Sequence, residues 1–355
     1  MLIEDLLKEL VEKKGSDLHI SNALPPVARI DGKLVRLDYD PLTPEGVEAL
    51  LFPMMSNEQR RRLEQEWELD FSYGVEGIGR FRVNFYKDKG CYAAAFRTIA
   101  TKAPQLEEMG MPPIVTTIAD KPRGLVLVTG PTGSGKSTTL AAMVDYINRT
   151  RAEHILTIED PVEFVHTSKV SIIHQRELGM DTRSFANALK SALREDPDII
   201  LVGEMRDHET IALALTAAET GHLVFGTLHT SSASQTIDRI IDVFPEGQQQ
   251  QIRVQLANSL VAVFAQTLLP KRQPDGSRKG RVMAQEIMVV TPAIANLIRE
   301  SKAAQIYSTI QTSSGAGMQT IESSLAELFK KGLVTIEDAL SKSSKPNELK
   351  RLIQG

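Results

Sequence analysis

The 355-residue sequence predicts an α/β protein with two domains. From residue 123 onward, apolar runs rich in β-branched residues alternate with segments of helical spacing, a pattern typical of a mostly parallel sheet covered by helices. A glycine-rich segment separates the first of these strands from the first helix. Residues 1–99 instead contain short strands separated by turns, which predicts a smaller α+β domain. We assign residues 100–112, which contain two prolines, to a linker and residues 113–355 to the second domain.

The first domain opens with an amphipathic helix over residues 2–13. Residues 27–37 form two short strands around Asp31-Gly32, a strong signal for a hairpin. Thr43 and Pro44 are a typical N-cap and first helical residue. They predict a helix over residues 45–51. The other expected elements are a second helix and three strands, at residues 57–65, 70–73, 79–86 and 91–99.

The second domain alternates strands with helices and ends in helices only. Its strands are predicted at residues 125–129, 155–158, 199–202, 223–227 and 282–289. Helices are predicted at residues 184–194 and 209–220, and beyond Thr291 at residues 293–300, 319–331 and 335–341. Ligands of open parallel sheets bind at the carboxyl ends of the strands, so we expect the functional site at that edge.

The composition indicates a soluble, cytoplasmic protein. The formal net charge is −4, which gives no general attraction to nucleic acid. The single cysteine, Cys91, excludes an internal disulfide and a multi-cysteine zinc site. The first nine residues are acidic where a signal peptide is basic. The most apolar long segment, residues 256–269, is interrupted by Asn258, Ser259 and Gln266 and is too short to be a transmembrane segment.

The glycine-rich segment matches the pattern G-x-x-x-x-G-K-S between a strand and a helix, the context that a phosphate-binding loop requires. Its glycines let backbone N–H groups close on a polyphosphate, and the helix N-terminus adds partial positive charge. Lys136 is expected to reach the β- and γ-phosphates of ATP, and the Ser137 hydroxyl to bind Mg²⁺. The alternative is a glycine-rich turn without this function. The candidate nucleotide-binding residues are Gly130, Pro131, Thr132, Gly133, Ser134, Gly135, Lys136, Ser137 and Thr138.

Three polar segments follow successive predicted strands, at residues 158–163, 198–207 and 226–230. Because all three strands end at the carboxyl edge of the sheet, the segments are expected to converge on the loop. Glu204 ends an apolar strand and is the candidate to orient and polarise the water that attacks the γ-phosphate. The alternative for Glu204 is a helix-capping acid.

The other candidates in these segments are less specific. The alternative interpretation of Glu159 and Glu163 is that they are solvated carboxylates of loops, without a catalytic role. His229 is placed to sense the γ-phosphate or hold the water, although a lone histidine is often structural. His222 is a weaker candidate of the same kind. Gly203 stands where many P-loop ATPases have a magnesium-associated aspartate, so Ser137 and waters, steadied by Glu159 or Glu204, are expected to hold the ion.

Three arginines of the first domain are expected to share one face of its sheet. Arg80 and Arg82 alternate with apolar residues, and Arg97 is placed similarly on the expected neighbouring strand. A charged, solvated sheet face is one interpretation. The other is that these arginines grip a phosphate of a nucleotide at a subunit interface, as arginine fingers do.

Four blocks of the sequence resemble the motifs of secretion-superfamily ATPases. GPTGSGKST at residues 130–138 resembles their Walker A motif, and TIEDP at residues 157–161 their Asp box. LREDPDIILVGEMRD at residues 193–207 resembles the Walker B motif, and TGHLVFGTLHT at residues 220–230 the His box. SDLHI at residues 16–20 and AIANLIRE at residues 293–300 narrow the resemblance to the type IV pilus retraction ATPases, over essentially the whole chain.

The resemblance implies a fold and a mode of action. Members of the family join a PAS-like N-terminal domain to a RecA-like P-loop ATPase domain and work as hexameric rings. ATP sits between the domains, and arginines of the small domain contribute to the site. On that basis the catalytic residues are expected to be Glu204, Glu159, Glu163, His229, His222, Arg80, Arg82 and Arg97.

The implied activity is ATP hydrolysis that powers pilus retraction and twitching motility. The expected partners are a homohexamer, an inner-membrane platform protein at the base of the pilus and, indirectly, pilin. Ala295 replaces an arginine expected in the late motif, while the spacing of its apolar residues is kept. Residues 270–280 lack the four-cysteine zinc insertion of assembly ATPases, and the N-terminal region lacks their extra domain, so retraction is favoured over assembly. Alternatives are an assembly or accessory retraction ATPase, a RecA-like nucleic-acid motor and a non-hydrolysing regulator.

Overall fold

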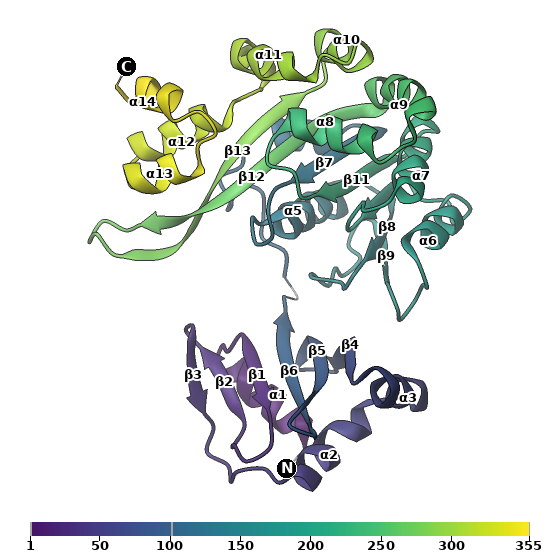
Figure 1. The fold of residues 1–355 in the computed structure, drawn as a ribbon, viewed down its shortest axis with the longest axis vertical. Coiled ribbons are helices and arrows are strands. Elements are labelled where there is room, and N and C mark those ends of the chain that lie inside the picture. Colours follow the sequence, from purple (N-terminus) through teal and green to yellow (C-terminus); the bar gives the residue numbers. More distant parts are fainter. Residues whose placement is uncertain (1, 101, 355) are drawn as a thin grey trace. The chain divides into compact units, whose positions relative to one another are not determined.

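The computed structural model describes residues 2–100 and 102–354, so residues 1, 101 and 355 of the predicted domains lie outside the described residues. The chain forms two compact units (Figure 1). The N-terminal unit comprises Met1–Lys102 and Pro161–Val165, and the C-terminal unit comprises Ala103–Asp160 and His166–Gly355. The segment 161–165 was expected in the second domain. It belongs to the first because Phe164 forms a parallel bridge with Ala100, the residue after the last strand of that unit.

The N-terminal unit contains one antiparallel sheet of six strands, in the order β3-β2-β1-β6-β5-β4. The predicted elements are confirmed with small differences at their ends, and β1 is a strand that we did not predict. The elements are α1 (Ile3–Glu12), β1 (Asp17–Ile20), β2 (Val27–Ile30), β3 (Lys33–Arg36), α2 (Pro44–Leu51), a 3₁₀ turn at Phe52–Met54, α3 (Asn57–Glu66), β4 (Glu68–Val75), β5 (Gly79–Asp88) and β6 (Cys91–Ile99).

One face of this sheet is apolar and the other polar. Phe81, Phe85 and Phe96 are almost fully buried in a core that also contains the leucines of α1. Residues that alternate with these phenylalanines point to the opposite face, because successive side chains of a strand point to opposite sides of a sheet. The polar face therefore carries the even-numbered residues of β5 and the odd-numbered residues of β6.

The C-terminal unit is an α/β unit, and the fold class predicted from the sequence is confirmed. Its elements up to the last strand are α4 (Ile114–Ala119), β7 (Gly124–Thr129), α5 (Lys136–Thr150), β8 (His154–Glu159), β9 (Ile172–Glu177), α6 (Phe185–Ala192), β10 (Ile199–Val202), α7 (His208–Glu219), β11 (Leu223–Leu228), α8 (Ala233–Asp242), α9 (Glu246–Ser259), β12 (Leu260–Arg272) and β13 (Arg278–Val289). The strands form a sheet in the order β13-β12-β7-β11-β10-β8-β9, parallel except for β13.

Several elements of this unit were not predicted, and the sequences of three of them, β9, α9 and β12, give the reason. β9 is an edge strand of mostly polar sequence, so it lacks the apolar run that identifies a buried strand. α9 contains four consecutive glutamines and buries few apolar side chains, which leaves a weak helical period. β12 lies in the apolar segment that was considered only as a membrane span. It pairs with β7 on one side and β13 on the other.

Helices cover both faces of the large sheet. Leu125 and Leu127 of β7 point to the face that α6, α7, α8 and α9 cover, whereas Val126 and Val128 point to the face covered by α4 and α5. Because β7 is buried on both faces, its sequence is a nearly continuous apolar run. The last helices are α10 (Pro292–Arg299), α11 (Ile306–Thr312), α12 (Ile321–Lys330), α13 (Ile336–Lys342) and α14 (Pro346–Gln354), with 3₁₀ turns at Ala303–Gln305 and Ser314–Ala316. Over residues 2–100 and 102–354, no helix has the length and apolarity that crossing a bilayer demands.

Candidate active site

The glycine-rich loop joins the end of β7 to the start of α5. Gly130, Gly133 and Gly135 have φ values of 143°, 77° and 91°, a region that favours glycine. A Cβ atom on Gly130 would collide with the carbonyl oxygen of Gln266 and would lie 2.6 Å from the Ser134 hydroxyl oxygen. The loop conformation therefore requires the glycine pattern read from the sequence.

The N-terminus of α5 is built to receive an anion. Its N-cap residue is Gly135, which offers no side-chain acceptor to the first-turn N–H groups. The Lys136 ammonium donates to the carbonyl oxygens of Gly130 and Pro131, at 2.9 and 3.3 Å, so it lies within the loop. Ser137 and Thr138 follow in the first turn and are half-buried.

The strand register brings the predicted polar segments to the edge of the sheet where the loop lies. Val202 pairs with Ile158 and with Gly226, while Leu228 pairs with Thr129. Because these strands are parallel, the residues that follow them lie along one edge, and these are Glu159, Gly203, Glu204, His229 and Gly130. The convergence of the segments on this edge is confirmed.

Glu204 lies at the centre of a charged cluster. One carboxylate oxygen accepts a hydrogen bond from Arg206 Nη2 at 2.7 Å, and the other lies 3.2 Å from His229 Nε2. The hydrogen bond from Arg206 is the main cause that lowers the pKa of Glu204, and partial burial opposes it. Positive charge on Arg206 and Lys136 acts in the same direction. Glu204 is therefore held in its anionic form, as a base that polarises water must be.

The alternative role of Glu204 as a helix-capping acid is contradicted by the next helix. Asp207 is the N-cap of α7, and its carboxylate accepts hydrogen bonds from the backbone N–H and the hydroxyl of Thr210, at 2.8 and 2.9 Å. The capping position is thus occupied by another residue, and Glu204 remains available at the carboxyl edge of the sheet.

Removal of the Arg206 guanidinium is expected to move the acid limb of the pH–rate profile. In Arg206→Ala the pKa of Glu204 rises, because its largest lowering influence is lost. A base works only when ionised, so kcat/KM for ATP falls off at a higher pH than in the wild type. Initial-rate measurements from pH 5 to 8 check this. Arg183→Ala, an exposed arginine between β9 and α6, is the control, and superimposable profiles for all three proteins would contradict the assignment.

Two other glutamates near this edge of the sheet have defined neighbours. Glu159 ends β8, and one of its oxygens accepts from the Thr157 hydroxyl at 2.6 Å and from Gln175 Nε2 at 3.2 Å. His229 follows β11, and the segment after it leads into α8. There the buried Glu286 accepts a hydrogen bond from the Ala233 N–H at 2.8 Å, and burial raises the pKa of Glu286 to about 7.

Close backbone contacts explain why position 203 is a glycine. A Cβ atom there would lie 3.1 Å from the Ile158 carbonyl oxygen and 3.2 Å from the Glu159 Cα atom. The Gly203 N–H also donates to that carbonyl at 2.8 Å, which holds the two strands close together. An aspartate at this position would need both neighbours to shift.

One predicted site residue of the C-terminal unit is not brought to the loop. His222 precedes β11, so it lies at the amino edge of the sheet, where its carbonyl oxygen accepts from the Gly124 N–H at 3.0 Å. Its Nδ1 lies 2.9 Å from the Ala217 carbonyl oxygen. The expectation that His222 joins His229 at the same site is wrong within this chain, because the six-residue strand separates them. Glu163 belongs to the N-terminal unit and is exposed there.

Sequence reasoning missed two residues of the site. Arg206 lies in the motif at residues 193–207, but no role was predicted for it. An arginine two residues from a catalytic acid is nevertheless a signal for an ion pair. Gln266 was noticed only as a polar interruption of an apolar segment. Its side chain is 2% exposed and its amide donates to the Ser134 carbonyl of the loop. A polar residue within an otherwise buried strand signals a specific hydrogen-bond partner.

The three arginines of the N-terminal unit share the polar face of its sheet. Arg82 lies directly opposite Arg97, and Arg80 lies opposite Ile99. Arg97 Nε donates to Asp17 at 2.8 Å, while Arg82 Nε lies 3.8 Å from Asp70. Each of these two arginines therefore has a carboxylate neighbour on the same face, and binding of a phosphate by them stays a prediction.

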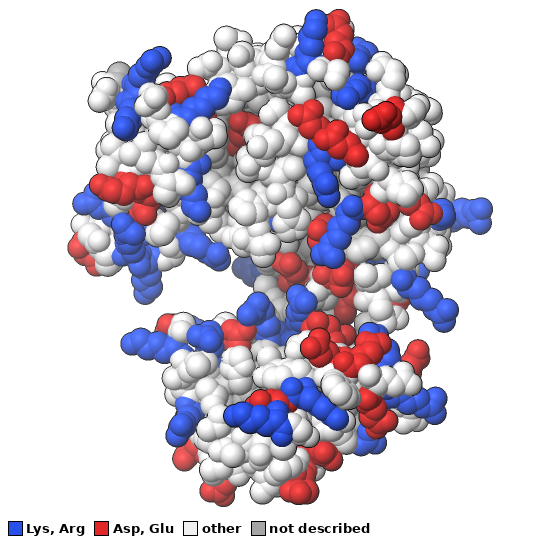
Figure 2. All heavy atoms as spheres, in the orientation of Figure 1, with Lys and Arg blue, Asp and Glu red and all other residues white. Residues whose placement is uncertain are grey.

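Two of these arginines, Arg82 and Arg97, border a hollow of about 370 Å³ on that face, which is also lined by Asp17, Asp70, Asn84, Ala95 and Phe96. Burial opposes ionisation of Asp17, but hydrogen bonds from Ser16 and Arg97 outweigh it and hold the pKa of Asp17 below its usual range. On the face of the molecule that Figure 2 presents, charges of both signs are interspersed over each unit.

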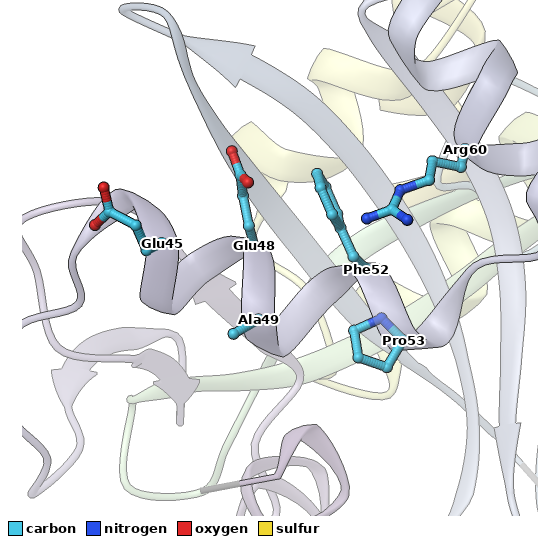
Figure 3. Close-up of a pocket in the computed structure, with 6 residues that line it drawn as sticks. All are labelled: Glu45, Glu48, Ala49, Phe52, Pro53 and Arg60. Carbon is cyan, nitrogen blue, oxygen red and sulfur yellow. The ribbon is translucent and has the colours of Figure 1, made fainter.

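A second hollow of the N-terminal unit, of about 450 Å³, lies between α2 and α3 (Figure 3). It is lined by Glu45, Glu48, Ala49, Phe52, Pro53 and Arg60. The Arg60 guanidinium carbon lies 4.2 Å from the centroid of the Phe52 ring, so this arginine is engaged in a cation–π contact. The hollow contains none of the predicted site residues, and the carboxyl edge of the large sheet remains the candidate active site.

Comparisons with known proteins identify relatives that are ATPases. A family model described as "Type II/IV secretion system protein" matches residues 1–341. The type IV pilus retraction ATPase PilT of Pseudomonas aeruginosa is 55% identical over 98% of this chain and 99% of its own length. The type IV pilus ATPase PilU of the same organism is 40% identical over 100% of this chain and 92% of its own length. A crystal structure of the pilus retraction motor PilT with bound ADP is 49% identical, covers 99% of both chains and superimposes with a TM-score of 0.92.

Proposed function

Since the chain belongs to the family of type II/IV secretion system proteins, we propose that it is the ATPase motor that powers type IV pilus retraction. The observation that carries this proposal is the meeting of the phosphate-binding loop, Glu204 and His229 at one edge of the large sheet. The identity to the relative named PilT extends over nearly the whole of both chains, so the N-terminal unit is included in the likeness.

The residues at this edge divide the work of hydrolysis. The N–H groups of the loop and the Lys136 ammonium hold the β- and γ-phosphates of ATP. The anionic Glu204 accepts a hydrogen bond from the attacking water and polarises it. His229, beside Glu204, holds that water or senses the γ-phosphate.

The oxygen donors at this edge suit Mg²⁺, which prefers hard oxygen ligands and retains several waters. The Ser137 hydroxyl would hold the ion, with Glu159 or Glu204 steadying its waters. When bound, Mg²⁺ neutralises charge that develops on the phosphates.

The motor works as a homohexamer on the cytoplasmic side of the inner membrane, at the base of the pilus. In this proposal Arg80, Arg82 and Arg97, which share the polar face of the N-terminal sheet, complete the nucleotide site. Hydrolysis then drives a change of domain orientation, which acts on an inner-membrane platform protein and through it on pilin. Glu163 and His222 are proposed to contribute in the assembled ring, since the carboxyl edge of the large sheet contains neither of them.

A role at the pilus other than primary retraction, such as an accessory one, is the second candidate, because the relative named type IV pilus ATPase PilU is 40% identical over 100% of this chain. The higher identity to the relative named PilT favours the primary motor.

Deletion of the encoding gene is expected to abolish twitching motility and to leave excess pili on the cell surface, because extension continues without retraction. Twitching-zone assays and quantification of sheared pili check this. Complementation with the wild-type protein should restore both phenotypes, and the Glu204→Gln variant should restore neither. A deletion strain without surface pili would indicate an assembly ATPase, and unchanged twitching would indicate an accessory one.

A further inference from the structure

Gln266 of β12 lies directly beneath the phosphate-binding loop. Its Nε2 donates to the carbonyl oxygen of Ser134 at 3.1 Å. Its Oε1 accepts from the Thr139 hydroxyl at 3.1 Å and from Gln285 Nε2 at 3.3 Å. Burial of an amide is unfavourable unless it is hydrogen-bonded, and an apolar residue of similar size would fill the same space without that requirement. A glutamine at this position therefore points to a task that an apolar side chain cannot perform.

The geometry of the peptide unit indicates this task. The peptide that joins Ser134 to Gly135 is planar and trans, so its C=O and N–H groups point in opposite directions. Because Gln266 holds the Ser134 carbonyl on the β12 side, the Gly135 N–H is directed to the other side, into the loop. Gly135 itself packs closely on this amide, since a Cβ atom there would lie 3.5 Å from Gln266 Nε2.

The neighbouring strand supplies one further hydrogen bond to Gln266, whose amide keeps its bonds to Ser134 and Thr139 without it. Gln285 of β13, whose Nε2 bonds to Gln266, donates its backbone N–H to the Ser324 hydroxyl of α12 at 3.1 Å. Its carbonyl oxygen accepts from Gln319 Nε2 at 3.0 Å. The side chains of Gln266 and Gln285 are both almost fully buried, so solvent does not compete for these hydrogen bonds.

We propose that Gln266 is a positioning residue for nucleotide binding, which aims the Gly135 N–H at the phosphates by holding the Ser134 carbonyl. Gln266 acts through the loop backbone and has no contact with the nucleotide. This role depends on the ATPase activity of the chain and is independent of pilus retraction, so the two proposals fail separately.

The test compares Gln266→Met with Gln285→Met in the purified full-length ATPase. Both variants remove a buried amide and keep the side-chain volume, but only the first removes the hydrogen bond to the loop. In Gln266→Met the Kd for ATP, measured with a fluorescent analogue, rises about three- to tenfold, the range expected for one neutral hydrogen bond. KM rises in parallel while kcat stays within about twofold, because the contact is present both before and during the reaction.

The control separates positioning from general stability. The Tm is expected to fall by a similar amount in both variants. In Gln285→Met, however, the Kd for ATP stays within about twofold of the wild-type value. An unchanged Kd in Gln266→Met, or an equal rise in Gln285→Met, would overturn the proposal. If Gln266→Met does not fold, Gln266→Asn serves instead, because its shorter side chain does not reach Ser134. The same rise in Kd is then expected, and a wild-type Kd would overturn the proposal.

Discussion

Glu204→Gln is expected to lower kcat for ATP hydrolysis by about 100-fold or more while nucleotide binding is retained. The amide has nearly the same shape as the carboxylate, but it lacks the negative charge and the basicity that polarise water. In the structure this charge is stabilised by Arg206 and faces His229, so the loss falls on the chemical step. Phosphate-release assays give kcat, and binding of a fluorescent ATP analogue gives the Kd.

The matched control for this variant is Glu209→Gln, which changes an exposed glutamate in the first turn of α7. Its ion pair with Lys190 lies on the surface, where such pairs contribute little to stability. Glu209→Gln is expected to retain wild-type kcat. Full turnover by Glu204→Gln would remove Glu204 from the catalytic residues and leave it a structural partner of Arg206.

Arg82→Ala and Arg97→Ala are each expected to reduce kcat by about 100-fold or more, because arginines that stabilise a transferring phosphoryl group contribute effects of this order. Arg82→Ala is not expected to lower the stability of the N-terminal unit. Its ion pair with Asp70, at 3.8 Å between side chains about half exposed, contributes about 1 kcal/mol at most. Removal also relieves the repulsion from Arg97. Steady-state kinetics and thermal unfolding of the same preparations check both statements.

Arg29→Ala is the control for the arginine face. Arg29 lies in the same row of the sheet, 3.7 Å from Asp17, and donates to the Gly32 carbonyl oxygen at 3.0 Å. The Arg29→Ala variant is expected to leave kcat unchanged.

Mixed rings test on which subunit Arg97 acts. Rings assembled from Glu204→Gln and Arg97→Ala subunits regain activity if the arginine acts on a neighbouring subunit, and they stay inactive if it acts within its own subunit. Wild-type kcat in both arginine variants would leave the interpretation of a solvated sheet face.

Local patterns predicted much of this molecule. Strands buried on both faces, such as β7 and β10, and helices with clear caps, such as α2 with Thr43 and Pro44, were recognised because their signals lie within a few residues. The arginine face was predicted for the same reason, since alternation along a strand is a local property. The polar edge strand β9 and the glutamine-rich helix α9 were not predicted, because tertiary packing stabilises them and their sequences have no clear apolar period.

Some features of the candidate site could likewise be predicted from local sequence, and others could not. The sequence by itself determined the glycine loop, Lys136, Ser137 and the acidic end of β10, because strand, loop and helix are consecutive and their residue types are specific to phosphate binding. Only the tertiary structure separated His222 from His229, joined Glu204 to Arg206 and His229, and placed Gln266 beneath Ser134. These relations depend on which strands are neighbours and in which register they pair. Strand order and register are set by packing between segments far apart in the chain, and no local period encodes them.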